Sequence, residues 1–522
     1  MSPEGRNFPF GMRRKSGQEP QAVTRVGQPL TLHGRAERFF TVPTPRSRIL
    51  AAAITKATGK NSGQHMSQQL TSGGEISPRP LWTGTITSPG AMRKVLLASL
   101  VGTAIEWFDF FLYGSATPLV FNRLFFPAKD PLVSLLLAYL SFALPFFIRP
   151  LGGIVFAHIG DRLGRKKTLV MTLSLMGGGT MLIGFLPTYA QVGFLASALL
   201  VALRLVQGLG LGGEWGGAVL LAYEYAAPSQ KGLYGSVPQA GVPIGLLFST
   251  LFFALASLLP DQEFISWGWR VPFVMSAALV LLGLWIRHGI DETPEFKALQ
   301  SAGQVARYPL LRVLQTCPKA VLIAILVKFV ETGSFYTFAV FLLSYATGTL
   351  GYSRVLTLAS IAAGAVVACV MIPVYGALSD QVGRYRVFAA GAAGLIAFAA
   401  PYFWLLSQRS TFALMLASTV ALGLLWPLVT SVLSSMLVEF FDAPVRYSGI
   451  SLGYQVGAAL VGGTAPLVAT LLLSLDHGRW RSVALYLAGI ALLSWIAATW
   501  GVTVRRPPVA EHAAPAGDGT QA

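Results

Sequence analysis

Charged residues are scarce in this sequence. Only 12% of its 522 residues are Asp, Glu, Lys or Arg, about half the share of an ordinary soluble protein. Hydrophobic residues make up 53%, and the mean hydropathy is +0.60. A water-soluble protein is therefore excluded, and so is disorder over most of the chain, because disordered segments are poor in apolar residues. The composition predicts a polytopic membrane protein.

Cysteine and the usual cofactor motifs are also lacking. Cys317 and Cys369 are the only cysteines, which excludes a disulfide framework, and neither they nor the six histidines show metal-ligand spacing. No G-x-x-x-x-G-K-S/T loop occurs, which removes the usual basis for ATP-driven transport. Residues 208–213 match G-x-G-x-x-G, but they follow no strand and lie in an apolar segment. We therefore expect no metal and no cofactor.

Acidic residues are outnumbered, and the formal net charge is +17. Residues 1–92 hold 12 Lys/Arg and 4 Asp/Glu, or +8, and the remaining 27 Lys/Arg and 18 Asp/Glu give +9. The first 92 residues contain no run apolar enough to span a membrane and no secretory signal. We interpret them as a basic, disordered leader. An over-extended gene start is the alternative, because Met92 directly precedes Arg93, Lys94 and the first apolar run.

Twelve apolar segments follow, most of them about 20 to 28 residues long and all able to cross a hydrocarbon core of about 30 Å as a helix. They cover 95–119, 132–157, 168–187, 193–222, 234–259, 271–288, 319–346, 354–378, 387–407, 411–438, 449–474 and 482–503. This pattern predicts an all-α membrane protein with twelve transmembrane helices in two six-helix bundles. The bundles are expected at 93–289 and 319–503, with a cytoplasmic loop at 290–318 between them and a disordered cytoplasmic tail at 504–522.

The distribution of Lys and Arg among the loops predicts the orientation. With both termini in the cytoplasm, the cytoplasmic segments after residue 92 carry 17 basic residues and the opposite side carries 7, while Arg149, Arg204 and Lys328 lie within spans. Cytoplasmic loops are enriched in Lys and Arg, so we expect both termini inside, at the plasma or inner membrane. The positive charge is thus mostly a topology signal, and no nucleic-acid partner is expected.

A short turn recurs at the same place in the two halves. The chain reads Gly-Asp-Arg-Leu-Gly-Arg between the second and third spans and Ser-Asp-Gln-Val-Gly-Arg between the eighth and ninth. Glycine suits a tight turn, and the Asp can accept hydrogen bonds from a helix N-terminus. Two such turns favour a transporter built from two related bundles. The expected loop and gating residues are Asp161, Arg162, Gly164, Arg165, Asp380, Gly383 and Arg384.

Longer motifs accompany these turns. They are Glu106-Trp107-Phe108-Asp109-Phe110 with Tyr113-Gly114, Arg149-Pro150-Leu151-Gly152-Gly153, Arg204-Leu205-Val206-Gln207-Gly208, Gly212-Gly213-Glu214-Trp215-Gly216-Gly217, Trp269-Arg270-Val271-Pro272-Phe273, Glu292-Thr293-Pro294 and Val445-Arg446-Tyr447-Ser448-Gly449. Over residues 93–503 the chain resembles the major facilitator superfamily and, more specifically, its metabolite:proton symporter family. The resemblance implies carriage of shikimate, 2-oxoglutarate, citrate or other carboxylates, or of proline and betaine. Ala157 departs from the family's turn, which usually has Gly four residues before the Asp.

Charged residues inside the spans are the candidates for the mechanism, because each costs about 2.5 to 3.5 kcal/mol or more at mid-bilayer. Glu106 and Asp109 lie three residues apart on one helical face, and two carboxylates in one low-dielectric cavity favour binding of a proton. We interpret them as proton-coupling residues, the alternative being that Asp109 is hydrated or structurally paired near a helix end. The family resemblance adds Arg204, because the arginine of its Arg-x-x-Gln-Gly motif is linked to proton transfer.

Arg149 lies twelve residues before Asp161, which is about 18 Å along a helix and places it near the midplane. There it can clasp a substrate carboxylate with two hydrogen bonds. The alternative is a salt bridge between helices, with Glu106 or Asp109 as its partner.

A polar stripe marks the seventh span. Lys328, Glu331, Thr332 and Phe335 follow the i, i+3, i+4, i+7 spacing of one helix face, with Tyr336 beside them. We expect this stripe to bind substrate from the C-terminal bundle, although Lys328 and Glu331 can instead simply neutralise each other. In the eleventh span, Tyr454 and Gln455 are further candidates for the same cavity.

These features predict a secondary active transporter that takes up a small organic acid or related metabolite with protons by alternating access. It is expected to act as a monomer in the lipid bilayer and not to be an enzyme. A proline/betaine-type carrier shares the same signatures. A drug/proton antiporter of this fold usually shows a Gly-Pro pair in its fifth span, whereas Val242 separates Gly241 from Pro243 here. A membrane-embedded transferase is disfavoured because the loops hold no compact acid/base or nucleophile cluster.

Overall fold

The computed structural model describes residues 89–163, 165–212, 222–223, 226–288, 309–442 and 445–504, all within one compact unit, Trp82–Ala522. Four of the expected loop residues lie outside this description: Gly164 altogether, and Asp161, Arg162 and Arg165 as regards their side chains. Most of the leader, the central loop and the tail also lie outside it. The boundaries expected for these segments therefore stay predictions.

Six long helices form the N-terminal half as far as the structure describes it. The first, α3 (Pro89–Ala116), continues through the π-helical turn η1 (Thr117–Phe121). The others are α5 (Pro131–Leu163), α6 (Arg165–Gly184), α8 (Phe194–Leu211), α10 (Lys231–Ala256) and α12 (Arg270–His288). The loops between them carry the short helices α4 (Asn122–Leu124), α7 (Tyr189–Val192), η2 (Pro228–Gln230), α11 (Asp261–Glu263) and η3 (Phe264–Gly268).

The C-terminal half repeats this plan after the short helix α14 (Pro309–Thr316). Its helices are α15 (Pro318–Tyr336), extended by η4 (Thr337–Phe341), α16 (Leu342–Ser344) and η5 (Tyr345–Thr349); α17 (Arg354–Val382); α18 (Arg384–Ser407); α19 (Thr411–Ser418) with η6 (Thr419–Leu425) and α20 (Trp426–Glu439); α21 (Arg446–Gly457) with η7 (Ala458–Gly462) and α22 (Ala465–Leu475); and α23 (Arg481–Val504). Gly383 ends α17 and begins α18 at a φ of 95°, a conformation that glycine adopts without steric cost.

A helix lies in each of the twelve expected segments. Nine helices of the described part are long and apolar enough to cross a membrane, and Asp261–Gly268 with Arg270–Trp285, bent by 43°, would be a tenth. The helices α3 and α6 fill the first and third expected spans. Large apolar side chains point outward, among them Phe194, Trp285 and Leu485 at 74–76% exposure. Such a surface is suited to lipid rather than water, and the predicted all-α membrane fold is confirmed.

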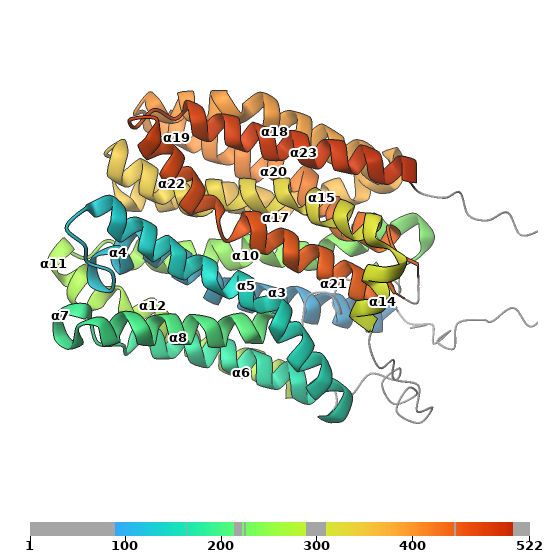
Figure 1. Ribbon diagram of the computed structural model, residues 1–522, viewed down its shortest axis with the longest axis horizontal. Helices are drawn as coiled ribbons and strands as arrows, with labels where there is room; N and C mark the ends of the chain where they lie inside the picture. The colour runs from blue at the N-terminus through green and yellow to red at the C-terminus, as the bar shows by residue number, and fades with distance from the viewer. Residues whose placement is uncertain are drawn as a thin grey trace, which may run out of the picture. The chain divides into compact units, whose positions relative to one another are not determined.

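The two halves meet through a reciprocal pair of contacts. The second helix of the C-terminal half, α17, packs along α10, the fifth helix of the N-terminal half (Figure 1). In the same way α5, the second helix of the N-terminal half, packs against α21, η7 and α22. The α10 to α17 approach requires small residues, because a Cβ on Gly232 would lie 2.5 Å from the carbonyl oxygen of Gly376. In each case the second helix of one half packs against the fifth helix of the other, which is the arrangement expected of two related bundles.

Candidate functional site

A small cavity lies between the two halves. Its volume is about 10 Å³, which is room for about one water molecule. The N-terminal half contributes Trp107, Phe146, Arg149 and Val242, and the C-terminal half contributes Lys328, Glu331, Thr332, Phe335, Tyr336, Trp426, Tyr454 and Ala458. The cavity therefore joins apolar and aromatic walls to a few charged groups, the usual chemistry of a small-molecule site. At this volume the cavity is almost filled by the side chains that line it.

Arg149 provides a cation from the N-terminal half. Its guanidinium lies 4.4 Å from the ring centre of Phe146 and 4.8 Å from that of Phe110, so cation–π attraction holds it in place. The residue is only 2% exposed, and its Nε and Nη2 atoms have no hydrogen-bond partner in the structure. Among the described residues no carboxylate forms an ion pair with it. Buried donors of this kind are costly unless a ligand or water satisfies them.

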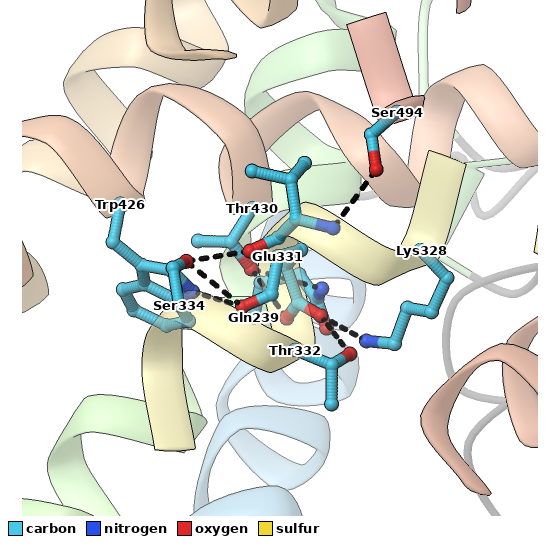
Figure 2. A network of polar contacts seen from close by, with 9 residues as sticks. Gln239, Lys328, Glu331, Thr332, Ser334, Trp426, Thr430 and Ser494 are labelled. Carbon is cyan, nitrogen blue, oxygen red and sulfur yellow. Dashed lines mark hydrogen bonds and ion pairs between the residues drawn. The ribbon is translucent and has the colours of Figure 1, made fainter. Parts of the chain in front are cut away.

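Lys328 and Glu331 form an ion pair in the C-terminal half (Figure 2). Glu331 is fixed further by the hydroxyl of Thr332, which donates to Oε2 at 2.7 Å, and by that of Thr430, which donates to Oε1 at 3.2 Å. The Lys328 ammonium lies 3.6 Å from the ring centre of Tyr454. Two opposite charges thus neutralise each other inside the cavity, which is the alternative that the sequence left open.

The Glu331 cluster also crosses between the halves. Gln239 of α10 donates a long hydrogen bond of 3.4 Å to the Thr430 hydroxyl, which in turn donates to Glu331 (Figure 2). The indole nitrogen of Trp426 donates to the Glu331 carbonyl at 2.9 Å. Sequence reasoning missed these three residues. A lone amide inside an apolar span could have indicated Gln239, but Thr430 and Trp426 carry no such signal.

Of the remaining predicted binding residues, Tyr336 lines the cavity and Gln455 does not. Both are buried, and neither the Tyr336 hydroxyl nor Oε1 of Gln455 has a hydrogen-bond partner in the structure. Their assignment as substrate-binding residues stays a prediction.

The predicted proton-coupling residues lie apart from the cavity wall. Asp109 is 1% exposed, and neither of its carboxylate oxygens has a hydrogen-bond partner in the structure. The nearby polar groups on α6 and α8 are engaged with one another: the Thr180 hydroxyl donates to the Met176 carbonyl at 3.1 Å and accepts from Gln207 at 2.7 Å. Glu106 is buried but does not line the cavity.

Arg204 is fully buried on α8. It donates to Gln207 Oε1 at 2.9 Å and to the Phe142 carbonyl at 3.3 Å. Its guanidinium also stacks on Tyr113, 3.8 Å from the ring centre. As with Arg149, no ion pair to a carboxylate is present within the described part of the chain. The arginine of the Arg-x-x-Gln-Gly motif is therefore linked to Thr180 of α6 through Gln207.

The end of the bundle that carries Gly383 is closed by contacts between the halves. Asp380 accepts hydrogen bonds from the backbone N–H groups of Gly232 at 2.7 Å and Leu233 at 3.0 Å, at the N-terminus of α10. Arg384 forms an ion pair with Glu439, which also accepts from the Tyr223 hydroxyl at 3.3 Å. An Asp at a helix N-terminus satisfies unpaired N–H groups and the helix dipole together. Here the capped helix belongs to the other half.

The opposite end is closed as well. Arg354 at the start of α17 forms an ion pair with Asp261, with 2.5 Å between Nη2 and Oδ1. Deeper in the protein, the Tyr139 hydroxyl of α5 donates to Ser344 of α16 at 2.8 Å. With both ends bridged and the cavity reduced to about 10 Å³, the structure is that of an occluded conformation.

Comparison with known proteins identifies the family. A family model described as the Major Facilitator Superfamily matches residues 99–463, most of the chain. The chain belongs to this superfamily. The shikimate transporter of Escherichia coli K12 is 40% identical over 422 residues, covering 80% of this chain and 96% of that protein. The inner membrane metabolite transport protein YhjE of the same organism is 41% identical over 420 residues, covering 79% and 94%.

A more distant relative is named as a transporter of other compounds. The glycine betaine/proline/ectoine/pipecolic acid transporter OusA of Dickeya dadantii is 32% identical over 431 residues, covering 80% of this chain and 85% of that protein. Among solved structures, a partially occluded inward-open conformation of the xylose transporter XylE from E. coli superposes with a TM-score of 0.62 at 14% identity, covering 80% of this chain and 98% of that one. At this identity the likeness concerns the fold.

These findings confirm the predicted membership of the major facilitator superfamily and its metabolite:proton symporters. The chain is a multi-pass membrane transporter, and its family and relatives are not enzymes. Proton-coupled symport by alternating access is the activity that the relatives and the fold support. The roles of individual residues are not decided by these likenesses.

Proposed function

We propose that the protein imports a small organic acid together with protons. In this proposal it works as a monomer in the inner membrane, with both termini in the cytoplasm, and needs no cofactor because the proton gradient drives it. The similarity to the shikimate transporter over nearly the whole length of that protein supports a carboxylate as substrate.

The observation that carries this proposal is the Arg149 guanidinium in the cavity between the halves. Two of its nitrogens lack partners, and an unpaired cation at this depth costs several kcal/mol. A substrate carboxylate would satisfy these donors with charge-assisted hydrogen bonds, which are about twice as strong as neutral ones. Lys328 is already neutralised by Glu331, so among the described residues of the cavity wall Arg149 is the cation that remains for the anion.

Asp109 is the proposed proton carrier. A carboxylate that is buried without a partner is far less costly to keep neutral than charged, so this residue favours a bound proton in the closed structure. A conformational change that exposes the Asp109 carboxyl to water would release the proton. Arg204 is proposed to assist through its link to Gln207 and Thr180. Glu106 stays a second proton-coupling candidate on the same helix.

The two closed ends are proposed to act as gates. Asp380, Gly383 and Arg384 would form the cytoplasmic gate in this orientation, and the Arg354 to Asp261 pair would lie at the outer end. Asp161, Arg162, Gly164 and Arg165 are proposed to play the matching part in the N-terminal half. Because the polar contacts between the halves form two separate sets, one at each end, a rocking motion can break one set while keeping the other.

Transport in proteoliposomes tests the proposal. With an inward proton gradient, labelled shikimate, 2-oxoglutarate or citrate should accumulate above its equilibrium level, and an uncoupler should abolish that accumulation. Efflux of an apolar cation against the gradient, with no accumulation of any acid, would contradict the proposal and favour the drug/proton antiporter. Uptake of proline or betaine in place of acids would favour an osmolyte carrier, for which the OusA likeness is the supporting observation.

A further inference from the structure

The Lys328 ammonium lies in a pocket of groups suited to a substrate's ammonium. We infer that Lys328 fills an ammonium subsite built from Glu331 and Tyr454, and that this filling restricts the transporter to substrates without a cationic group. The inference rests on the proposed uptake of organic acids and names the residue that decides which acids are accepted.

The subsite has two parts that recognise an ammonium. Glu331 supplies a carboxylate whose two oxygens are oriented by Thr332 and Thr430 (Figure 2). Tyr454 supplies an aromatic face, and the Lys328 nitrogen lies 3.6 Å from its ring centre. A carboxylate beside an aromatic face is the combination that proteins use for ammonium and quaternary ammonium ligands. Both residues line the same cavity as Arg149.

The fold directs the lysine into this position. The Lys328 side chain leaves α15 and crosses α21 at Gly457, where an added Cβ would lie 2.7 Å from Lys328 Cβ and 3.0 Å from Cγ. Because Gly457 has no side chain, the aliphatic stem of Lys328 lies directly on α21. Tyr454 is three residues earlier on that helix and so on the same face. The glycine therefore lets the ammonium reach the tyrosine ring.

Charge balance then separates substrate classes. The charged groups among the described residues of the cavity wall are Arg149, Lys328 and Glu331, with a net charge of +1. A monocarboxylate makes this sum zero. A zwitterion such as betaine leaves it at +1, and its ammonium meets a subsite that Lys328 already occupies. Without Lys328, Arg149 and Glu331 would offer one cation and one anion, which complements a zwitterion.

The Lys328→Ala variant tests this inference, with glycine betaine as the probe. In the wild-type protein, an excess of glycine betaine should not reduce acid uptake or raise the thermal unfolding temperature. In K328A, glycine betaine should bind at least tenfold more tightly than in the wild-type protein and should compete with the acid. Alanine suits a helix interior, so the substitution itself is compatible with α15. Methylammonium should raise the thermal unfolding temperature of K328A, because it can take the place of the missing Lys328 ammonium.

Matched variants separate this effect from a general disturbance. Lys328→Arg keeps a cation beside Glu331 and should still exclude glycine betaine. The double variant K328A with Glu331→Gln removes both charges and should neither bind glycine betaine nor respond to methylammonium. Lys328→Gln is shorter but can still donate to Glu331, so it preserves the fold if K328A does not, and it should gain betaine binding to a smaller degree.

The outcomes distinguish this inference from the proposed function. If the wild-type protein accumulates no acid, the proposed function fails. If it accumulates an acid but neither K328A nor K328Q gains glycine betaine binding, the ammonium subsite is wrong while acid uptake stands. Betaine binding by the wild-type protein as tight as that by K328A, or binding by the double variant, would also overturn the subsite.

Discussion

Replacement of Asp380 by Asn should open the end of the transporter that carries Gly383. The Asp380 carboxylate accepts backbone hydrogen bonds of 2.7 and 3.0 Å from Gly232 and Leu233 across the interface. Asn can keep one of these bonds, but its amide NH₂ then faces the other N–H, and the attraction between carboxylate and helix dipole is lost. The substitution also removes the ion pair of Asp380 with Arg384, 3.6 Å between Oδ1 and Nη2, but this pair lies within the C-terminal half and does not bridge the interface. Arg384 keeps Glu439 as its partner.

The free energy by which D380N destabilises the closed end follows from these two lost interactions. A hydrogen bond to a charged group contributes about 1.5 to 3 kcal/mol, and a charge at a helix N-terminus contributes about 0.3 to 1 kcal/mol. Asp380 is 8% exposed, so solvent screens these interactions little. The D380N variant should therefore lose about 2 to 4 kcal/mol of closed-end stability. At 1.4 kcal/mol per factor of ten, the closed-to-open ratio should fall by roughly 30-fold to several-hundred-fold.

Distances between spin labels in nanodiscs measure this shift. Labels at Ser229 and Gln381, both exposed and on opposite halves, report the separation at this end, with Cys317 and Cys369 replaced by Ser. D380N should move most of the population to longer distances. Asp130→Asn is the matched control, because Asp130 also accepts a backbone N–H, at 2.8 Å from Leu132, but within one half. An unchanged distance distribution in D380N, or an equal change in D130N, would show that the Asp380 contacts across the interface do not hold this end closed.

Three further variants probe the cavity, the proton site and the other gate. Arg149→Lys removes the fork that can bind a carboxylate with two hydrogen bonds, so the half-saturating concentration for acid uptake should rise about tenfold; an unchanged value would count against contact with substrate. Asp109→Asn cannot bind and release a proton, so acid should exchange across the membrane without accumulating, and retained uphill uptake would exclude this residue. Asp261→Asn breaks an ion pair whose acid is 82% exposed; such pairs contribute about 0 to 1 kcal/mol, so initial uptake rates should change less than about fivefold, and complete loss of transport would contradict this weak coupling.

The helices and their grouping could be predicted from hydropathy because a membrane span needs a long, continuous apolar run. The 3.6-residue period likewise predicted that Lys328, Glu331, Thr332 and Phe335 share a face, and all four line the cavity. The prediction that an Asp of the repeated turn can accept from a helix N-terminus rested on local chemistry. Asp380 does accept from one.

Partners across the interface could not be predicted in the same way. The helix that Asp380 caps is α10 of the other half, and only the packing of α10 on α17 brings them together. Periodicity placed Glu106 and Asp109 on one face of α3 but could not say what that face meets, and neither residue lines the cavity. Thr430 is an ordinary threonine in an apolar helix until Glu331 is placed beside it.

Uptake by purified protein in proteoliposomes is the direct test of proton-coupled acid symport. With an inward proton gradient and no other energy source, we expect a labelled carboxylate from the set shikimate, 2-oxoglutarate and citrate to accumulate above equilibrium, and an uncoupler to collapse this accumulation. Uptake that is indifferent to the uncoupler, or failure to accumulate any acid under a verified gradient, would contradict proton-coupled acid symport.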